Sequence, residues 1–360
     1  MRKTKSYRME SILEERIVMG DYTLLDFPAE RKLAAAFNVT QMTARKAVKN
    51  LERRGLLRRL PNGSVTAAGK RNRTAAFLAP AVFSSHIFHF QNLLSQNAAE
   101  AGWQLRTVLY MHWDDAVIEE ALERFDGVFL YPVREQLSER VTELLQETRT
   151  PVLSLGIDLS EWGIPAFLEQ SGNAADLMID YLKEQGYHEI DFLLTQPWRE
   201  NNRSLLEQWR ARLTSLGLNG QCFDFPVESY GDSYEQAFRC VGSLLEQKRL
   251  LSRCILGATM AEAVGACRAL ASHGIQPGRE FAVSCVQRGR GGIGDYYIPS
   301  ITGVEAEDCG AILRDYFDWM AEPERHRPEK MVRTGGPGKI FIGESVIPAA
   351  ALERKQENLT

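Results

Sequence analysis

Residues 27–60 constrain the fold of this chain more than any other stretch, because they hold two short amphipathic segments joined by a tight turn. The first segment begins at Pro28, and proline suits the first turn of a helix because its missing N–H costs nothing there. Thr40, in the turn, can cap a second helix over 41–54. Gly55 then ends that helix, since glycine is favoured just past helix ends. Two helices at this spacing predict a helix-turn-helix.

Two further elements complete a small module. A helix is expected over residues 7–19, where apolar residues recur at helical spacing. Residues 56–60 and 64–67 can pair as a hairpin, with a turn at Asn62 and Gly63. The pattern therefore predicts a winged helix-turn-helix, a shape that places its second helix in the major groove of DNA.

The second helix of this motif divides into an apolar face and a polar end. The residues expected to face the module core are Met42, Ala47, Val48 and Leu51. The residues left near the amino end are Gln41, Thr43, Ala44 and Arg45. That end of a DNA-reading helix meets base edges, so its polar residues are candidate DNA contacts.

Charge is divided unevenly along the chain. Residues 1–73 hold 17 Lys and Arg against 7 Asp and Glu, a net charge of +10. The remainder holds 26 basic and 40 acidic residues, a net charge of −14. Phosphate binding depends on local charge, so the total of −4 does not argue against DNA binding. The alternative is a solvated basic face without a ligand.

Three motifs of this stretch resemble the DNA-binding domain of the GntR family. They are Pro-x-Glu-Arg at 28–31, Val-Thr-x-x-Thr-x-Arg at 39–45 and Leu-Glu-x-x-Gly-Leu at 51–56. The resemblance implies that four residues touch DNA, namely Arg31, Thr40, Arg45 and Gly63. Gln41, Thr43 and Asn62 complete the candidate set, because they lie at the same helix end and in the same wing turn.

Gln41 departs from that family's pattern. Many members carry Arg directly after the turn Thr, where it can hold guanine, whereas the amide of Gln41 suits adenine. We therefore expect a different operator sequence. For Arg31 the alternative is a surface ion pair with Glu30 or Asp26.

After a small, basic linker at 68–74, short apolar runs alternate with amphipathic segments. Strands are expected at 75–79, 105–109, 127–131, 152–155, 190–195, 255–257, 281–285, 300–304 and 339–347. Helices are expected at 88–101, 115–124, 137–147, 174–185, 204–216, 261–273 and 307–320. This rhythm predicts an α/β domain of two lobes over 75–350, each with a parallel sheet covered by helices. The DNA-binding domain would then span 1–67, and 351–360 would form a tail.

The order of these elements resembles the effector domain of the LacI family, which shares its fold with periplasmic sugar-binding proteins. The matching segments are Ala101-Gly102-Trp103, Asp126-Gly127-Val128, Pro151-Val152, Asp180-Tyr181-Leu182, Gly186-Tyr187 and Ile298-Pro299-Ser300-Ile301-Thr302. A GntR-type module on such a domain is the arrangement of arabinose-repressor-like proteins. The resemblance implies a homodimer, with a ligand between the lobes beyond the carboxyl ends of the strands.

Three positions depart from the LacI-type ligand site. An Arg of that family is replaced here by Leu205, an Asn-Asp pair by Thr259-Met260, and an Asp by Val286. In the family these residues hydrogen-bond sugar hydroxyls, so their loss argues against a simple free sugar. Losing a carboxylate while arginines remain nearby favours a sugar-like ligand that is anionic.

Seven residues follow strand ends and form the candidate effector set. They are His86, Phe88, Arg134, Trp198, Arg203, Gln287 and Arg288. Aromatic rings stack on flat ligand faces, and Arg forks bind carboxylate or phosphate. Each also has a packing or surface role as its alternative, and a core role suits Phe88.

Several kinds of site are not expected. The six cysteines form no CxxC pair, which favours free thiols over zinc or disulfides. His86 and His89 have the i,i+3 spacing of two metal ligands, but no third ligand is near in sequence, so we expect no metal. No run of 18 apolar residues exists and the charged N-terminus lacks a signal core, so we expect a cytoplasmic protein without a membrane span.

These observations favour a transcription regulator, a repressor, that binds double-stranded operator DNA and responds to a small ligand. One alternative is a regulator whose cleft has lost ligand binding and serves for dimerisation or protein contact. Another is an enzyme that holds pyridoxal phosphate, which needs a Schiff-base Lys and a phosphate-binding loop. No Lys beyond residue 74 follows an apolar strand suitably, and no helix follows the Gly-rich 289–294. We therefore expect neither an enzyme nor a cofactor.

Overall fold

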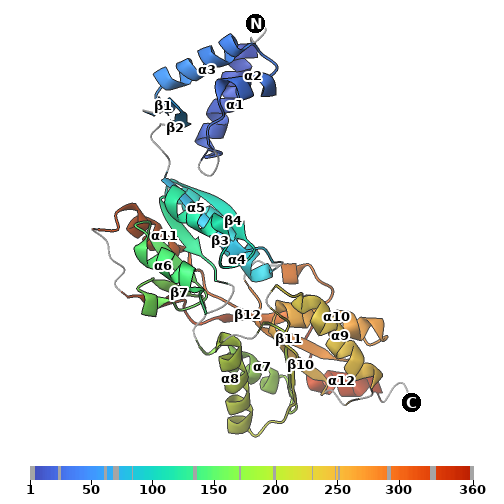
Figure 1. Cartoon of the computed structure of the whole chain (residues 1–360). Helices are drawn as coiled ribbons and strands as arrows, with labels where there is room; N and C mark the ends of the chain where they lie inside the picture. Colours follow the sequence, from blue (N-terminus) through green and yellow to red (C-terminus); the bar gives the residue numbers. More distant parts are fainter. Residues whose placement is uncertain are drawn as a thin grey trace.

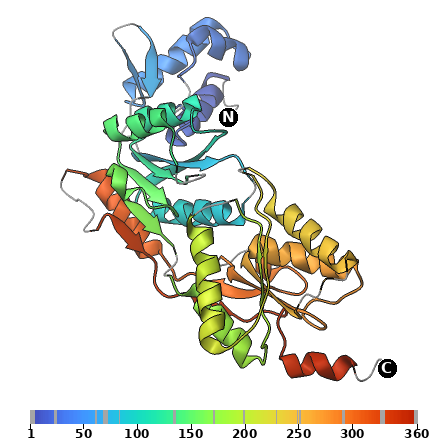
Figure 2. The same ribbon diagram turned by 60° about the horizontal axis from the view of Figure 1, so that its bottom comes forward.

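A small N-terminal module precedes two larger lobes in the computed structural model (Figure 1). The structure describes residues 5–22, 26–60, 63–67, 73–82, 84–132, 136–169, 172–197, 200–228, 230–247, 249, 252–289, 293–324 and 330–356. The expected linker lies largely outside these residues. Figure 2 shows the N-terminal module at one end of the molecule and the C-terminal helix at the other.

The N-terminal module is the predicted winged helix-turn-helix. It consists of α1 (Lys5–Val18), α2 (Glu30–Ala36), α3 (Gln41–Arg53) and the antiparallel wing strands β1 (Leu57–Arg59) and β2 (Val65–Ala67). Thr40 caps α3 as predicted, because its hydroxyl oxygen accepts the Thr43 N–H at 3.2 Å. Gly55 has a φ of 74°, a left-handed conformation that only glycine adopts without strain, and the chain leaves the helix there.

The buried face of α3 differs from the expectation at Met42. This side chain is 75% exposed, whereas Ala44, Ala47, Val48 and Leu51 are fully buried against α1 and α2. A helix turns 3.6 residues per revolution, so Met42 lies nearly opposite Ala44 and cannot share its face. Met42 was therefore wrongly predicted to point inward.

Lobe 1 contains a parallel sheet in the order β13-β7-β6-β5-β3-β4. The strands are β3 (Arg73–Pro80), β4 (Trp103–Tyr110), β5 (Gly127–Leu130), β6 (Val152–Leu155), β7 (Ala166–Leu168) and β13 (Val332–Thr334). Helices α4 (Ser85–Glu100) and α11 (Gly310–Ala321) cover one face, and α5 (Ala116–Arg124) and α6 (Glu139–Glu147) cover the other. The short helix η1 (Ser160–Trp162) precedes β7.

Lobe 2 repeats this plan in the order β14-β12-β11-β10-β8-β9, with β14 antiparallel. The strands are β8 (Asp191–Leu194), β9 (Cys222–Asp224), β10 (Cys254–Thr259), β11 (Ala282–Gln287), β12 (Thr302–Glu305) and β14 (Lys339–Phe341). Helices α7 (Ala174–Glu184), α8 (Glu200–Leu216) and α12 (Ala349–Gln356) cover one face, and α9 (Ser233–Glu246) and α10 (Met260–Ser272) cover the other. The short helix η2 (Ile293–Asp295) follows β11.

The chain crosses between the lobes after β7, after β12 and between β13 and β14. The crossings pack closely, since Gly335 donates to the Leu168 carbonyl at 2.8 Å. A Cβ atom on Gly335 would lie 2.1 Å from the Glu169 carbonyl oxygen, so this position requires glycine.

The two-lobe architecture predicted from the sequence is confirmed, with five helices and strands missed. They are β7, β9, β13, α9 and α12. Three of these are strands of only three residues, too short for a periodic pattern. The expectation of a tail over 351–360 is wrong for its first part, because α12 reaches Gln356 and its Leu352 packs in the core of lobe 2. The single strand expected over 339–347 is wrong, because β14 ends at Phe341.

Candidate functional site

The amino end of α3 presents polar side chains to solvent. Gln41 and Arg45 are exposed and Thr43 is half-buried, whereas Ala44 is buried in the module core. The hydroxyls of Thr40 and Thr43 lie 2.8 Å apart, which orders both side chains. One amide, one guanidinium and two hydroxyls are thus gathered here, and these groups bind base edges and phosphates.

Arg31 lies exposed on α2. The two acids considered as its partners from the sequence pair with other cations: Glu30 lies 3.8 Å from Arg59, and Asp26 lies 3.7 Å from Arg124. Within the described part of the chain Arg31 has no ion pair, so its guanidinium can face a phosphate.

The wing turn follows β1. Gly63 is exposed and has a φ of 83°, and its N–H donates to the Leu60 carbonyl at 2.9 Å. Asn62, the other predicted wing contact, lies outside the described residues. The structure therefore places the backbone of the wing tip, through Gly63, at the surface of the module.

The N-terminal module also contacts lobe 1. Arg106 of β4 donates to the Asp21 carboxylate at 2.6 Å and to the Met19 carbonyl at 2.9 Å. Beside it, the Gln104 amide donates to the Val18 carbonyl. Partly exposed pairs of this kind contribute about 1 kcal/mol or less each, so the contact can break and re-form.

A charged cluster lies at the carboxyl end of the lobe 1 sheet, where α4 begins and β7 ends. Glu169 accepts hydrogen bonds from His86 Nε2 at 2.7 Å and from His89 Nε2 at 2.6 Å. His86 Nδ1 lies 3.0 Å from the Tyr131 hydroxyl. Glu169 is only 5% exposed, so the two imidazoles replace water as partners of its charge.

Hydrogen bonding within this cluster favours the charged forms. Burial disfavours a charged His86, but Tyr131 and the hydrogen bond with Glu169 outweigh it and raise the pKa of His86 to about 10. Burial also disfavours a charged Glu169, whereas the bonds from His86 and His89 hold the pKa of Glu169 below its usual range. His86 and Glu169 therefore form an ion pair near neutral pH.

A third side chain of a type that can bind metal, Glu169, lies beside His86 and His89, although none is near them in the sequence. It lies 80 residues beyond His89 along the chain. The three side chains bond to one another, and among the described residues no group of His, Cys, Asp and Glu is arranged to hold a metal ion.

Lobe 2 holds a second buried carboxylate at corresponding strand ends. Glu262 is fully buried and accepts the N–H groups of Thr195 and Thr259, both at 2.9 Å. It also accepts their hydroxyls, at 3.0 and 2.6 Å, and the Gln196 amide at 3.3 Å. This capping box fixes the start of α10 against the ends of β8 and β10.

Arg288 is buried inside lobe 2, with its side chain 0% exposed. Its Nε donates to the Ile301 carbonyl at 2.8 Å, and its other nitrogens pair with Asp295 and Glu305. The guanidinium also lies 3.6 Å from the ring centre of Phe341. All of these partners belong to lobe 2, so the donors of Arg288 are used within the lobe.

The remaining effector candidates are not gathered into one site. Gln287 is half-buried at the end of β11. Arg203 lies in the first turn of α8 with its side chain 61% exposed, and its Nε lies 3.5 Å from Glu207. Arg134 and Trp198 lie outside the described residues.

Phe88 lies on α4 between His86 and His89 in sequence but is 61% exposed. A core role for this ring is therefore wrong. Leu205, which replaces the Arg of LacI-type ligand sites, is buried at 6% exposure in the packing of α8 on its sheet.

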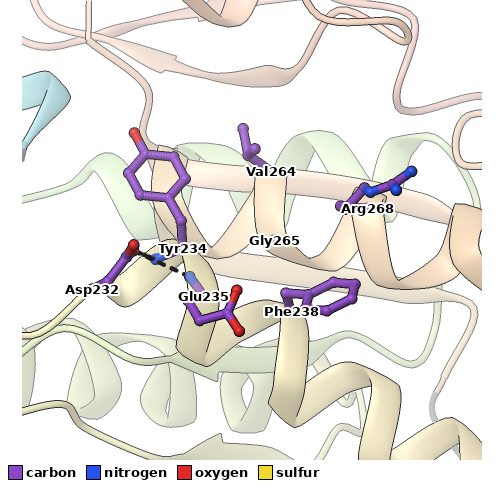
Figure 3. A pocket seen from close by; sticks show the side chains of 7 residues that line it. All are labelled: Asp232, Tyr234, Glu235, Phe238, Val264, Gly265 and Arg268. Carbon is purple, nitrogen blue, oxygen red and sulfur yellow. Dashed lines mark hydrogen bonds between the residues drawn. The ribbon is translucent and has the colours of Figure 1, made fainter.

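A groove of about 420 Å³ lies on α9 and α10, and we call it the α9–α10 groove (Figure 3). Its lining residues are Asp232, Tyr234, Glu235, Phe238, Val264, Gly265 and Arg268. Figure 3 shows the two acids near one end and Arg268 at the other, with apolar side chains between them. A Cβ atom on Gly265 would lie 2.6 Å from the Cβ of Ala237, so glycine lets the two helices touch.

Of the two buried carboxylates Glu262 and Glu169, only Glu262 is marked by a local sequence pattern. Thr259 and Glu262 have the Thr-x-x-Glu spacing of a capping box. Glu169 follows a strand of only three residues, which is too short to show a strand pattern in the sequence. Its contact with α4 depends on the order of strands in the sheet, which local patterns do not contain.

The N-terminal module matches a known family model. Residues 6–66 match the model described as "Bacterial regulatory proteins, gntR family", which confirms the resemblance. A comparison of the chain with curated proteins gives no match.

Solved structures share the fold of most of the chain. The transcription regulator CcpA of Lactococcus lactis is 20% identical with a TM-score of 0.60, covering 76% of this chain and 99% of that one. A LacI-family CcpA from Weissella paramesenteroides with bound sucrose is 18% identical with a TM-score of 0.62, covering 77% and 100%. The Lac repressor bound to ONPG in its repressed state is 16% identical with a TM-score of 0.59, covering 91% and 95%. The two-lobed part therefore has the fold of LacI-type regulators.

Among the described residues, no helix is both long enough and apolar enough to cross a bilayer.

Proposed function

We propose that this protein is a DNA-binding transcription regulator, a repressor, whose operator affinity is controlled by a small ligand held between its two lobes. The exposed polar end of α3 carries this proposal, because Gln41 and Arg45 lie there on a module that matches the gntR family. The net charge of +10 over residues 1–73 supports phosphate binding. The role is binding rather than catalysis, and it would be exercised in the cytoplasm, where bacterial DNA lies.

The proposed DNA surface joins three parts of the N-terminal module, which we take as residues 1–67. Its contacts are Arg31 on α2, Thr40, Gln41, Thr43 and Arg45 at the start of α3, and Asn62 and Gly63 in the wing. The exposure of Arg31 and Gly63 supports this set. The α3 residues would contact bases, and Arg31 and the wing would hold the phosphate backbone.

Arg45→Ala tests the DNA surface. Because Arg45 lies one turn into α3 and is exposed, its removal should weaken binding to a selected operator by about 1–3 kcal/mol, roughly 5- to 150-fold. A mobility-shift titration measures this. Arg8→Ala, which removes an exposed Arg from α1, serves as the control and should have little effect. Unchanged binding by the Arg45 variant would remove α3 from the DNA surface.

The proposed effector is sugar-like, and it would contact both lobes at the carboxyl ends of their strands within residues 75–350. His86 at the carboxyl end of the lobe 1 sheet, about a third exposed, and Gln287 at the end of β11 support this placement. Thr259 pairs with Gln287 across neighbouring strands, and the Gln196 amide donates to the Thr259 hydroxyl. Three of these four groups are neutral, which suits sugar hydroxyls. Structures of similar fold hold lactose and sucrose.

A thermal-shift screen of neutral sugars, sugar acids and sugar phosphates tests the effector. A ligand at about 100 times its dissociation constant should stabilise the protein by about 2.7 kcal/mol. Gln287→Ala should lose the shift, whereas Thr214→Ala, at an exposed position of α8, should keep it. If acids alone give a shift, Arg203 is the candidate cation, because the charge of His86 is paired with Glu169. If no compound does, a regulator without a small-molecule ligand becomes the better account.

We also propose that the protein is a homodimer formed through the α9–α10 groove. Tyr234, Phe238 and Val264 supply apolar surface. In a two-fold pair the acidic end of one groove can meet Arg268 of the other, so the surface is complementary to itself. Two structures of similar fold are of dimeric Lac repressors.

The contact between the N-terminal module and lobe 1 supplies a route from ligand to DNA. Asp21 and Asp26 face Arg106 and Arg124 across it. A movement of lobe 1 within the dimer would therefore change the orientation and spacing of the two DNA-binding modules. The ligand must bind the two arrangements with different affinities for this to control operator binding.

A further inference from the structure

We propose that Arg59 is a positioning residue for DNA binding, which holds the wing against α2 and α3 and does not itself contact phosphate. The proposal rests on the function proposed above, because it concerns how the DNA surface is assembled. Arg59 ends β1, immediately before the wing turn.

A single guanidinium connects three parts of the module. Arg59 Nη1 donates to the Gly63 carbonyl in the wing turn at 3.0 Å. Its Nη2 lies 3.0 Å from Glu52 on α3 and 3.8 Å from Glu30 on α2. The planar guanidinium holds its nitrogens in a fixed fork, so one hydrogen bond and two ion pairs together define where the wing tip lies relative to α3.

The surroundings of Arg59 are unsuited to a phosphate. Two carboxylates, 21% and 24% exposed, share its one positive charge. A DNA phosphate approaching this group would meet a local excess of negative charge. In addition, Arg59 Nη1 already donates to the Gly63 carbonyl.

The neighbouring Arg58 provides a matched comparison. Successive residues of a strand point to opposite faces, and Arg58 is exposed, with no ion pair among the described residues. The two adjacent arginines thus have opposite roles: Arg58 can meet phosphate, and Arg59 braces the wing. A count of basic residues alone would assign both to DNA.

The first test measures operator affinity across salt concentration, using a duplex that the full-length protein selects from a random pool. Arg58→Gln should lower affinity and reduce the slope of log K against log salt by about one, as expected for one lost phosphate contact. Arg59→Gln should lower affinity about tenfold with an unchanged slope, because ordering the wing on binding carries an entropic cost. A reduced slope for Arg59→Gln would overturn the proposal.

Glu52→Gln distinguishes the two roles most sharply. If Arg59 contacted phosphate, removal of the competing carboxylate would strengthen DNA binding. If Arg59 braces the wing, the same change weakens DNA binding, and the double variant with Arg59→Gln is no worse than either single one. Stronger binding by Glu52→Gln would contradict the proposal.

Hydrogen exchange on the DNA-free protein gives a readout that does not need an operator. Arg59→Gln should speed exchange of the Gly63 and Leu60 amides, which are hydrogen-bonded within the wing, and leave the amides of α3 protected. Unchanged exchange in the wing would refute the brace. Failure of the wild-type protein to select any DNA, with wing exchange faster in the variant, would instead refute the proposed function alone.

Discussion

Val264→Glu should convert the protein from dimers to monomers and lower operator affinity by about 100-fold or more. Val264 lies on α10 beside Tyr234 and Phe238 in the α9–α10 groove. In a two-fold dimer the new carboxylate would be buried next to its own copy and to Glu235. Burying this charge costs several kcal/mol, more than the ~0.5 kcal/mol that an i,i+4 pair with Arg268 returns. A monomer binds one half-site and loses the avidity of two linked modules, which contributes about 10²- to 10⁴-fold.

Sedimentation and mobility-shift titrations at one protein concentration measure both effects. Thr214→Glu is the control, because it adds the same charge at an exposed position of α8, on the opposite face of the lobe 2 sheet. A second variant, Ile298→Asp, examines the loop after η2, where Ile298 is 97% exposed. A stable dimer of Val264→Glu that keeps full operator affinity would exclude the α9–α10 groove as the dimer interface.

Glu169→Ala should destabilise the folded protein by about 3 kcal/mol near pH 6, the cost of leaving a buried cation without its partner. Glu169 is 5% exposed and holds both His86 and His89. About a third of the His86 side chain meets solvent, which keeps the cost at the lower end of the range. Glu161→Ala, which removes an exposed carboxylate of the same lobe, should change the free energy of unfolding by less than about 0.5 kcal/mol.

The deficit of Glu169→Ala should depend on pH in a defined direction. The pKa of His86 is raised to about 10, so its stabilising contribution is complete below the unfolded value of about 6.5 and fades as pH rises toward 10. The pKa of Glu169 is lowered, so its contribution is present above the unfolded value and is lost in acid. Denaturant titrations at several pH values should therefore show the largest deficit at about pH 5–6.5. A deficit that grows from pH 7 to pH 10 would contradict the ion pair.

Local chemistry explains why the N-terminal module could be predicted closely. Thr40 and Gly55 act through the backbone of their own neighbours, so their effect is the same in almost any context. Pro28 was expected in the first turn of its helix but lies before the cap residue Ala29, since α2 begins at Glu30. The prediction that Met42 faces the core was wrong because it relied on the apolar side chain alone. The helical period places Met42 away from the face that Ala44 and Leu51 share. Which side of a helix is buried depends on the angular position of each residue around the helix axis as well as on its residue type.

The alternation of strands and helices in the two lobes could be predicted from the sequence, but the short strands could not. The long parallel strands, such as β3 and β10, are nearly continuous runs of buried residues that a pattern can show. The short strand β13 is held in the sheet by its pairing with β7. Its existence depends on a neighbour more than 160 residues away, which a local pattern does not contain.

By itself, the sequence determined the winged module, the alternation of strands and helices, and the residue types available at each strand end. Only the tertiary structure decided which of those residues meet. In the structure Arg288 points into its own lobe and pairs with Asp295 and Glu305. Glu169 pairs with His86 and His89. Charges are neutralised by partners brought close by strand order and by the crossings between lobes. The spacing of residues along the chain does not show which of them are close in space. The roles of the buried charged residues could therefore be determined only from the tertiary structure.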